Sequence, residues 1–287
     1  MENDVIVVIG KSGQLAWELQ QLDTQQKLVF FGRNDIDITS PESIKEVLSS
    51  LSVKSIINAS AYTAVDKAES EPEQAYLINR DAVRNLAEYC QSKHIHLTHV
   101  STDYVFGGDK GSPYLPDDEY NPQSVYGKSK MEGEIAIKEV LLDNSAIIRT
   151  SWVYSSHGNN FVKTMLRLMG ERDQLSVVDD QIGSPTSAAG LAKFCLQLSS
   201  EDIPGVFHYT DKGICSWYDF AKLIQDFALE SNKLSKRISI TPIFSEQFPT
   251  PAKRPSYSVL KDSKVDKLNR TEREHWSDNV KAIISNM

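Results

Sequence analysis

The sequence is short of cysteine, of basic charge and of long apolar runs, and each shortage excludes a class of protein. Lys and Arg total 31 against 39 Asp and Glu, and the net charge of -8 argues against a nucleic-acid surface. The cysteines are three in number, show no CxxC spacing and are therefore expected to be buried thiols in a reducing cytoplasm. They are Cys90, Cys195 and Cys215.

No stretch approaches the roughly 18 apolar residues of a membrane helix. The N-terminal segment, MENDVIVVIG, carries acids where a signal peptide carries basic residues, and its apolar run is short. We therefore expect a cytoplasmic protein without a membrane partner. The 287 residues, 40% hydrophobic and 24% charged, suffice for one large domain or two intimate ones.

Short apolar runs alternate with helix-like segments over the first half of the chain. Continuous β-branched runs separated by helices are typical of a parallel sheet covered on both faces. The pattern predicts an α/β fold with a Rossmann-like, doubly wound parallel sheet. The expected strands are 5–10, 27–32, 55–60, 96–102 and 146–154, and the expected helices begin at Ser12 or cover 40–48, 72–92 and 124–140, with Ser40 and Pro41 as a helix start.

After Tyr154 the alternation loosens. Helices are expected over 157–169 and 187–198, and a strand over 175–180. We predict a dinucleotide-binding domain over 1–154, to which later segments near 187–211 return, and a smaller substrate-binding lobe over 155–287.

Gly10, Gly13 and Ala16 follow the first expected strand at the spacing G-x-x-G-x-x-A and open a helix. Glycine permits positive backbone angles and lets a pyrophosphate approach the main chain. The amides and the dipole of the helix start attract phosphate. A tight strand-to-helix turn is the alternative, but the position after the first strand favours a dinucleotide site.

The end of the second expected strand bears on the choice of dinucleotide. NAD-type proteins usually carry an acid there, whereas this chain has Gly32 followed by Arg33. A guanidinium suits a 2′-phosphate, so NADPH is favoured. The alternative is that Arg33 is a solvated loop residue and that Asp35 or Asp37 meets the cofactor, in which case NADH is the cofactor.

Tyr126 and Lys130 are four positions apart and would share one face of a helix. Alone, such a pair is most simply an exposed tyrosine beside a solvated lysine. Thr102, however, ends the fourth expected strand, at the sheet edge where ligands bind. Thr102, Tyr126 and Lys130 together resemble the catalytic set of the extended short-chain dehydrogenase/reductase superfamily.

That resemblance implies a role for each of the three residues. Tyr126 would exchange a proton with the substrate oxygen, and Thr102 would polarise the carbonyl. Lys130 would lower the tyrosine pKa and bind the nicotinamide ribose.

Six motifs spread over the chain narrow the resemblance. They are NASAYTAVDKAESEPE (58–73), STDYVF (101–106), VYGKSK (125–130), RTSWVY (149–154), DDQIGSPT (179–186) and TPAKRP (250–255). Together they resemble the dTDP-4-dehydrorhamnose reductase family. The resemblance implies NAD(P)H-dependent reduction of the C4 ketone of dTDP-4-dehydro-β-L-rhamnose, the last step of dTDP-L-rhamnose synthesis for cell-surface polysaccharide such as lipopolysaccharide O-antigen.

The resemblance also assigns further site residues. Thr102, Asp103 and Trp152 would contact the substrate, and Arg254 would bind its diphosphate unless it is an ordinary surface arginine. On the cofactor, it assigns the phosphates to Gly13, Gln14 and Leu15 beside Gly10, the adenine to Asp37 and Ile38, and the nicotinamide half to Ala61, Tyr62 and Thr63.

Rival functions remain open at this level. A dehydratase needs an acid where Tyr104 stands, and a 4-epimerase normally shows serines at that motif. A non-catalytic NADP-binding subunit, like the regulatory subunit of methionine adenosyltransferase, or a reductase of a related dTDP-6-deoxy-4-ketohexose, would share most features. A homodimer fits the resemblance. Trp17 and Trp217 are expected to be packing residues, and Asn79 either belongs to the helix flanking the site or has a cap or surface role.

Metal binding has little support in the sequence. His94, His96 and His99 fit no zinc spacing and are expected at strand edges. Some members of the family hold Mg²⁺ through acids near a dimer interface, and Glu18 could be one of them. The segment 184–191 offers no evident second acid, so we expect no tight Mg²⁺ site.

Overall fold

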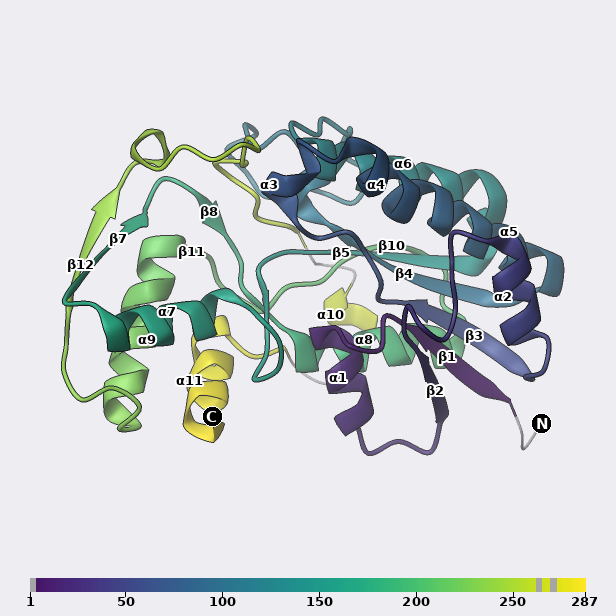
Figure 1. The fold of residues 1–287 in the computed structure, drawn as a ribbon, viewed down its shortest axis with the longest axis horizontal. Helices are drawn as coiled ribbons and strands as arrows, with labels where there is room; N and C mark the ends of the chain where they lie inside the picture. Colours follow the sequence, from purple (N-terminus) through teal and green to yellow (C-terminus); the bar gives the residue numbers. More distant parts are fainter. Residues whose placement is uncertain (1–3, 262–264, 269–272) are drawn as a thin grey trace.

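A six-stranded parallel sheet dominates the computed structural model, which describes residues 4–261, 265–268 and 273–287 (Figure 1). The order β10-β5-β4-β3-β1-β2 reverses at β1, and such a switch point is where ligands bind in open α/β sheets. The expected doubly wound α/β fold is thus confirmed. The strands are β1 (Val5–Ile9), β2 (Lys27–Phe31), β3 (Val53–Asn58), β4 (His96–Thr102), β5 (Ser145–Thr150) and β10 (Gly205–His208).

Helices cover both faces of this sheet because its strands are apolar on both. Along β1, Val5, Val7 and Ile9 point into one core and Ile6 and Val8 into the other. On the first face lie α2 (Pro41–Leu48), α5 (Ala82–Lys93) and α6 (Val125–Leu141), and on the second lie α1 (Gln14–Gln21), α8 (Ala188–Glu201) and α10 (Val265–Leu268).

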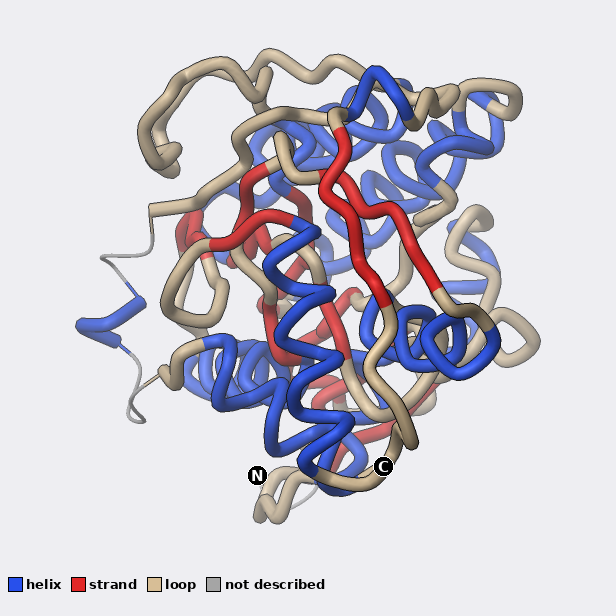
Figure 2. Tube along the Cα trace, turned by 90° about the vertical axis from the view of Figure 1, so that its left-hand side faces the viewer, coloured by secondary structure: helices blue, strands red, loops and turns tan. Residues whose placement is uncertain are grey.

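A smaller lobe with its own core stands beside the carboxyl ends of the strands (Figure 1). Figure 2 faces this lobe, where β7 and β12 run next to one another as a parallel pair. Its elements are α7 (Phe161–Glu171), β7 (Gln174–Val178), α9 (Trp217–Glu230), β12 (Ser239–Ile243) and α11 (Trp276–Asn286). The structure also has two short strand pairs, β6 (Val153–Tyr154) with β9 (Thr186–Ser187) and β8 (Ile182–Gly183) with β11 (Cys215–Ser216).

The expected start of α2 is confirmed. Pro41 is its first residue, and the Ser40 side chain accepts a hydrogen bond from the Ser43 amide at 3.2 Å. The expected helix over 72–92 is instead divided into α4 (Pro72–Tyr76), a π-helical turn (Leu77–Asp81) and α5, after the short α3 (Val65–Ala68). π-Turns of this kind often mark functional sites.

Two further expectations differ from the structure. The expected strand 146–154 ends at Thr150, because Trp152 adopts a φ of +48° and turns the chain into β6. His96 begins β4 and His99 lies within it, and β4 is an interior strand of the sheet rather than an edge. His94 directly follows the last residue of α5 and has a φ of +57°.

The three cysteines are free and buried. Within the described ranges, none of the helices combines the length and the apolar character that crossing a bilayer requires.

Candidate active site

The turn after β1 requires glycine at its first position. Gly10 has a φ of +105°, and a Cβ there would lie 2.9 Å from the Ala59 carbonyl and the Ser60 nitrogen. The Gly13 amide donates to the Gly10 carbonyl at 2.9 Å, and no described side chain caps the start of α1. The first amides of α1 therefore suit a phosphate group, as the sequence predicts.

A cavity of about 510 Å³ lies beside this turn. Two cationic side chains, Lys11 and Arg33, line it, and the nearby Asp35 carboxylate lies 4.0 Å from the Lys11 ammonium. Trp17, expected to be a packing residue, also lines the cavity and stacks on His157 with ring centroids 5.4 Å apart. The cavity fits an anionic group better than a neutral ribose edge.

Asp37, the acid expected to flank the adenine, is engaged locally. Its carboxylate accepts hydrogen bonds from the Thr39 hydroxyl at 2.7 Å and the Thr39 amide at 2.9 Å, and these bonds lower the pKa of Asp37. The side chains of Leu15 and Ile38 are buried in the two cores, so their main chains are what a cofactor could meet.

Gln14 joins the glycine turn to the smaller lobe. Its side-chain oxygen accepts from the Asn160 amide group at 2.9 Å, and its nitrogen lies 3.5 Å from the Val153 carbonyl. The loop that follows β6 is thus fastened to the turn that would hold the phosphates.

The loop after β3 holds Ala61, Tyr62 and Thr63, and Asn79 pins it. The Asn79 oxygen accepts from the Tyr62 amide at 2.9 Å, and its nitrogen donates to the Tyr62 carbonyl at 3.1 Å and to the Ser129 hydroxyl at 3.0 Å. Asn79 is fully buried in the π-helical turn. It therefore ties the expected nicotinamide loop to α6, rather than serving as a surface residue.

Thr102 and Tyr126 come together at the carboxyl end of β4. Both are buried, and their side chains lie close enough for the Thr102 hydroxyl to act on the Tyr126 phenol. Burial raises the pKa of Tyr126, and the nearby Thr102 hydroxyl acts in the opposite direction. The Tyr104 ring meets Tyr126 edge-on with centroids 5.5 Å apart. Tyr126 is therefore a neutral phenol that carries a proton, but the net rise in its pKa is opposite to the lowering expected from Lys130, because burial outweighs the other effects.

Lys130 lies one helical turn after Tyr126 and is only 1% exposed. Its Nζ donates to the Val100 carbonyl at 2.7 Å and lies 3.1 Å from the His99 Nε2 atom. Burial lowers the pKa of Lys130 to about 8, against the opposing charge of Glu134. The sequence signal that could have found His99 is its place on β4, three residues before Thr102.

Asp103, expected to contact the substrate, is 2% exposed. Its Oδ1 accepts from the Thr102 hydroxyl at 3.0 Å, and burial raises the pKa of Asp103 to about 6. Its carboxylate therefore fixes the rotamer of Thr102.

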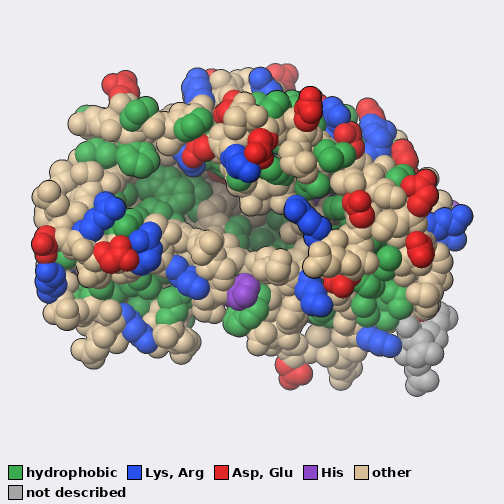
Figure 3. All heavy atoms as spheres, viewed as in Figure 1, with side chains coloured by type: hydrophobic (Ala, Val, Ile, Leu, Met, Phe, Trp, Pro, Cys, Tyr) green, Lys and Arg blue, Asp and Glu red, His purple; other side chains and the backbone are tan. Residues whose placement is uncertain are grey.

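A larger cavity, about 1390 Å³, opens between the lobes, where Figure 3 shows the surface hollowed and partly lined by apolar side chains. Phe161, Met165 and Trp217 contribute apolar walls. Trp217, also expected to be a packing residue, stacks on Trp152 with ring centroids 3.5 Å apart. The predicted substrate residue Trp152 thus stands behind Trp217 at this cavity.

Arg254 lines the same cavity with Lys253 and Arg172. Its guanidinium lies 2.8 Å from the Asp66 carboxylate and donates to the Tyr104 hydroxyl at 3.3 Å. The cavity therefore combines apolar walls with a group of cations, as a nucleotide diphosphate would require.

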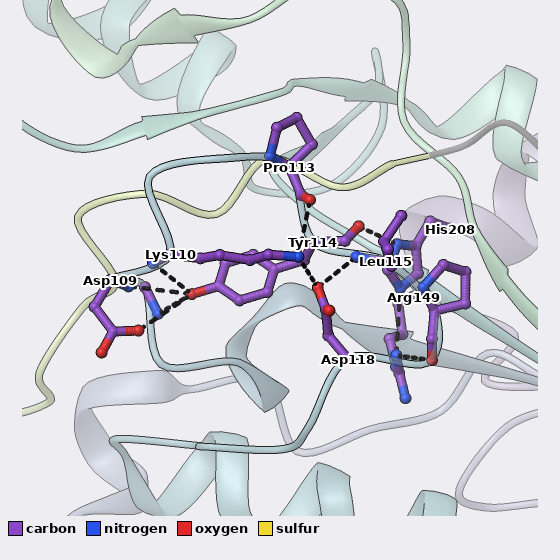
Figure 4. Close-up of polar contacts among 10 residues, drawn as sticks. Asp109, Lys110, Pro113, Tyr114, Leu115, Asp118, Arg149 and His208 are labelled. Carbon is purple, nitrogen blue, oxygen red and sulfur yellow. Dashed lines mark hydrogen bonds and ion pairs between the residues drawn. The ribbon is translucent and has the colours of Figure 1, made fainter.

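The loop after β4 forms another wall of this cavity, and one phenol organises it (Figure 4). The Tyr114 hydroxyl accepts from the amides of Gly108, Asp109 and Lys110 at 2.8, 3.1 and 3.3 Å. The Tyr114 ring stacks on Phe106 with centroids 4.4 Å apart. Gly107, Gly108 and Asp109, which face the cavity, are thereby held in place.

Glu18, the acid considered for Mg²⁺, is 9% exposed, and burial raises its pKa against a hydrogen bond from Ser155 and the nearby His157. Among the residues that the structure describes, no three His, Cys, Asp or Glu side chains are grouped to hold a metal ion.

Comparisons with known proteins agree with this geometry. A family model described as "RmlD substrate binding domain" matches residues 4–287. A dTDP-4-dehydrorhamnose reductase of Sinorhizobium fredii is 39% identical over an alignment of 287 positions that covers 97% of this chain and 96% of that protein.

Two solved structures superpose closely on the chain. A dTDP-4-dehydrorhamnose reductase of Clostridium acetobutylicum has a TM-score of 0.92 and 39% identity, covering 98% of both chains. One from Bacillus anthracis, in complex with NADP, has a TM-score of 0.93 and 35% identity, covering 100% of both chains.

Proposed function

The chain belongs to the RmlD substrate binding domain family, and from that premise we propose that it reduces the C4 ketone of dTDP-4-dehydro-β-L-rhamnose to dTDP-β-L-rhamnose with NADPH. The observation that carries the proposal is the meeting of Thr102 and Tyr126 at the sheet edge that also bears the glycine turn. NADPH supplies the hydride when bound.

The first step assigned to the chain is proton donation. A hydride arriving at C4 leaves negative charge on the ketone oxygen, and a proton must reach that oxygen as the charge develops. Tyr126 holds a proton in a buried site, and the Thr102 hydroxyl beside it can donate to the same oxygen. Donation from two positioned hydroxyls stabilises the developing charge before the proton moves.

Lys130 assists the proton transfer from Tyr126 by its positive charge. As an ammonium it favours the tyrosinate that remains after proton transfer, and it stands one turn from Tyr126 on α6. The Thr102 hydroxyl donates to Asp103 Oδ1 at 3.0 Å, so it must leave this acceptor before it can donate to the substrate oxygen.

We assign NADPH to the cavity beside the glycine turn and the dTDP-sugar to the cavity between the lobes. The glycine turn with Lys11 and Arg33 fits the phosphates of NADPH, because the turn offers main-chain amides and the two side chains offer positive charge. The cavity between the lobes fits the dTDP-sugar, with Arg254 and Lys253 for the diphosphate and Trp217 as an aromatic wall.

The test is oxidation of NADPH, followed by loss of reduced-nicotinamide absorbance, with dTDP-4-dehydrorhamnose prepared enzymatically. Product identification by NMR distinguishes L-rhamnose from a related 6-deoxyhexose. NADH and Tyr126→Phe provide the cofactor comparison and the inactive control. Absence of turnover with any dTDP-4-keto sugar, while NADPH binds, would leave a non-catalytic NADP-binding subunit as the better description.

We also propose a homodimer and a cytoplasmic location. The family resemblance supports the dimer, and the use of NADPH with a sugar nucleotide supports the location. Light scattering after gel filtration and cell fractionation test the two proposals separately.

A further inference from the structure

Three buried polar side chains form a line beneath the catalytic tyrosine. Asn58 ends β3, His99 lies on the neighbouring β4, and Lys130 reaches them from α6. The Asn58 Nδ2 atom is 3.1 Å from His99 Nδ1, and His99 Nε2 is 3.1 Å from Lys130 Nζ. All three residues are at most 1% exposed, so these contacts are not shared with solvent.

The contacts of Asn58 with Ser60 fix which atoms donate and which accept among the three side chains. Asn58 Oδ1 accepts from the Ser60 amide at 3.1 Å and from the Ser60 hydroxyl at 2.6 Å. A main-chain amide can only donate, so the Asn58 oxygen must face Ser60 and its NH₂ group must face His99. His99 Nδ1 is therefore an acceptor and carries no proton.

The protonation of His99 is then determined. Burial holds the pKa of His99 well below its ordinary range, so the ring is neutral. A neutral imidazole with an unprotonated Nδ1 carries its proton on Nε2. That N–H points at Lys130 Nζ.

An ammonium group has only donors, whereas an amine has a lone pair that can accept. Lys130 already donates to the Val100 carbonyl at 2.7 Å, so an amine there satisfies both neighbours at once. We propose that His99 is a positioning residue of the reaction, whose Nε2–H donates to Lys130 and stabilises the lysine as a neutral amine. The inference rests on the proposed function, in which Lys130 assists Tyr126.

Other charged groups act on the same lysine. Glu134, one turn later on α6, favours the ammonium, but Arg149 on β5 meets the Glu134 carboxylate at 2.8 Å and shares its charge. Tyr126 on α6 is held neutral by burial. His99 on β4 therefore opposes Glu134 and sets how much of Lys130 is charged near neutral pH.

Only charged Lys130 assists Tyr126, so kcat/KM should fall as the pH rises through the pKa of Lys130, near 8. His99→Asn removes the Nε2–H but keeps an acceptor for Asn58. The fall of kcat/KM at high pH is the basic limb of the pH profile. Loss of a donor that favours the amine should move this limb to higher pH by about one to two pH units.

Asn58→Asp is a second variant, which keeps His99 but should move its proton to the other ring nitrogen. A carboxylate facing His99 Nδ1 would draw the proton to that atom and leave Nε2 as an acceptor for the ammonium. The basic limb should again move upward, and further than in His99→Asn. His96→Asn is the matched control, because His96 lies on the same strand and bonds Asn144 instead.

The direct measurement is the ¹⁵N spectrum of protein labelled in histidine, together with the titration of the Lys130 side chain by NMR. A proton on Nε2 of His99 and an upward shift in both variants support the proposal. A proton on Nδ1, a downward shift in His99→Asn or a basic limb identical to that of the control would overturn it. The tautomer and the Lys130 titration need no turnover, so they decide the matter even if the enzyme proves inactive. The tautomer is measured in the unmodified protein, so it remains decisive even if a variant fails to fold.

Discussion

Arg254 and Asp66 form an ion pair at the cavity between the lobes, with Nη2 of the arginine 2.8 Å from Oδ2 of the aspartate. The Asp66 carboxylate thus competes with the substrate diphosphate for the Arg254 guanidinium. Arg254→Ala should raise KM for the dTDP-sugar by about 10- to 100-fold, the worth of one or two charged hydrogen bonds, and should lower kcat less.

Asp66→Asn is the informative counterpart of Arg254→Ala. It should release the guanidinium and lower KM a few-fold while the Ala252 amide keeps its acceptor. Steady-state kinetics of the two variants test the assignment. A collapse of kcat at unchanged KM in Arg254→Ala would assign the arginine to the chemistry or to the fold instead.

Arg33 lines the cavity beside the glycine turn, where we propose that it meets the 2′-phosphate of NADPH. Arg33→Ala should lower kcat/KM for NADPH by about 10- to 100-fold and leave that for NADH nearly unchanged. Arg84→Ala is the control, because Arg84 lies on α5 and is bonded to Glu139 on α6 rather than lining this cavity. A preference for NADH in the unmodified protein, unaffected by the substitution, contradicts the role of Arg33.

Tyr126→Phe should cost about 10² to 10⁴ in kcat, because it removes the proposed general acid while the ring still packs. The Kd for NADPH should stay close to that of the unmodified protein. Lys130→Ala should weaken both turnover and cofactor binding. Tyr104→Phe is a matched control, since it loses a contact with Arg254 and should change KM more than kcat. Near-normal turnover of Tyr126→Phe is the result that would exclude the tyrosine.

Tyr114→Phe should loosen the wall of the substrate cavity. The phenol oxygen accepts from three successive amides, and phenylalanine leaves the buried Gly108 amide without that partner. The free energy of unfolding should fall by about 1–3 kcal/mol, and KM for the sugar nucleotide should rise. Denaturant unfolding and kinetics measure the two effects, with Tyr89→Phe on α5 as the control. An unchanged KM would show that this wall does not contact the substrate.

Glu134 and Arg149 form an ion pair whose side chains are 0% and 1% exposed. Burial alone would raise the pKa of Glu134, but Arg149 and the hydrogen bonds outweigh it and the net shift is downward. The pair's contribution to stability is therefore complete above the ordinary glutamate pKa and is lost as the pH falls through the lower, folded-state pKa.

Glu134→Ala should accordingly lower the free energy of unfolding by about 3–5 kcal/mol at neutral pH, since it leaves Arg149 buried without its partner. The loss should shrink in acid. A double substitution of Glu134 and Arg149 by leucine and methionine should be less harmful than the single one. Denaturant titrations at several pH values measure these differences, and equal losses at all pH values would contradict the pKa direction.

The sequence predicted those features that depend on local chemistry. The glycine turn at Gly10, the start of α2 at Ser40 and the placement of Thr102 at a strand end each follow from a few adjacent residues. The positive φ of Trp152 could not be foreseen, because it accompanies stacking against the distant Trp217. The clamp formed by Asn79 depends likewise on a loop that is remote in sequence.

His99 shows the same limit within the candidate site. Its spacing to the other histidines suggested nothing, and its contacts with Asn58 and Lys130 arise only when β3, β4 and α6 are assembled. Residues that act through a neighbour are therefore harder to predict than residues that carry a motif.

The last strand of the large sheet has a consequence for how the protein is made. β10 pairs with β5, yet the chain forms part of the smaller lobe between them. During synthesis on the ribosome, one edge of β5 therefore stays unpaired until β10 has emerged. Unpaired strand edges can associate with other chains. A fragment that ends after Tyr154 would keep that edge permanently, so the two lobes cannot be obtained as separate modules by a single cut in the gene.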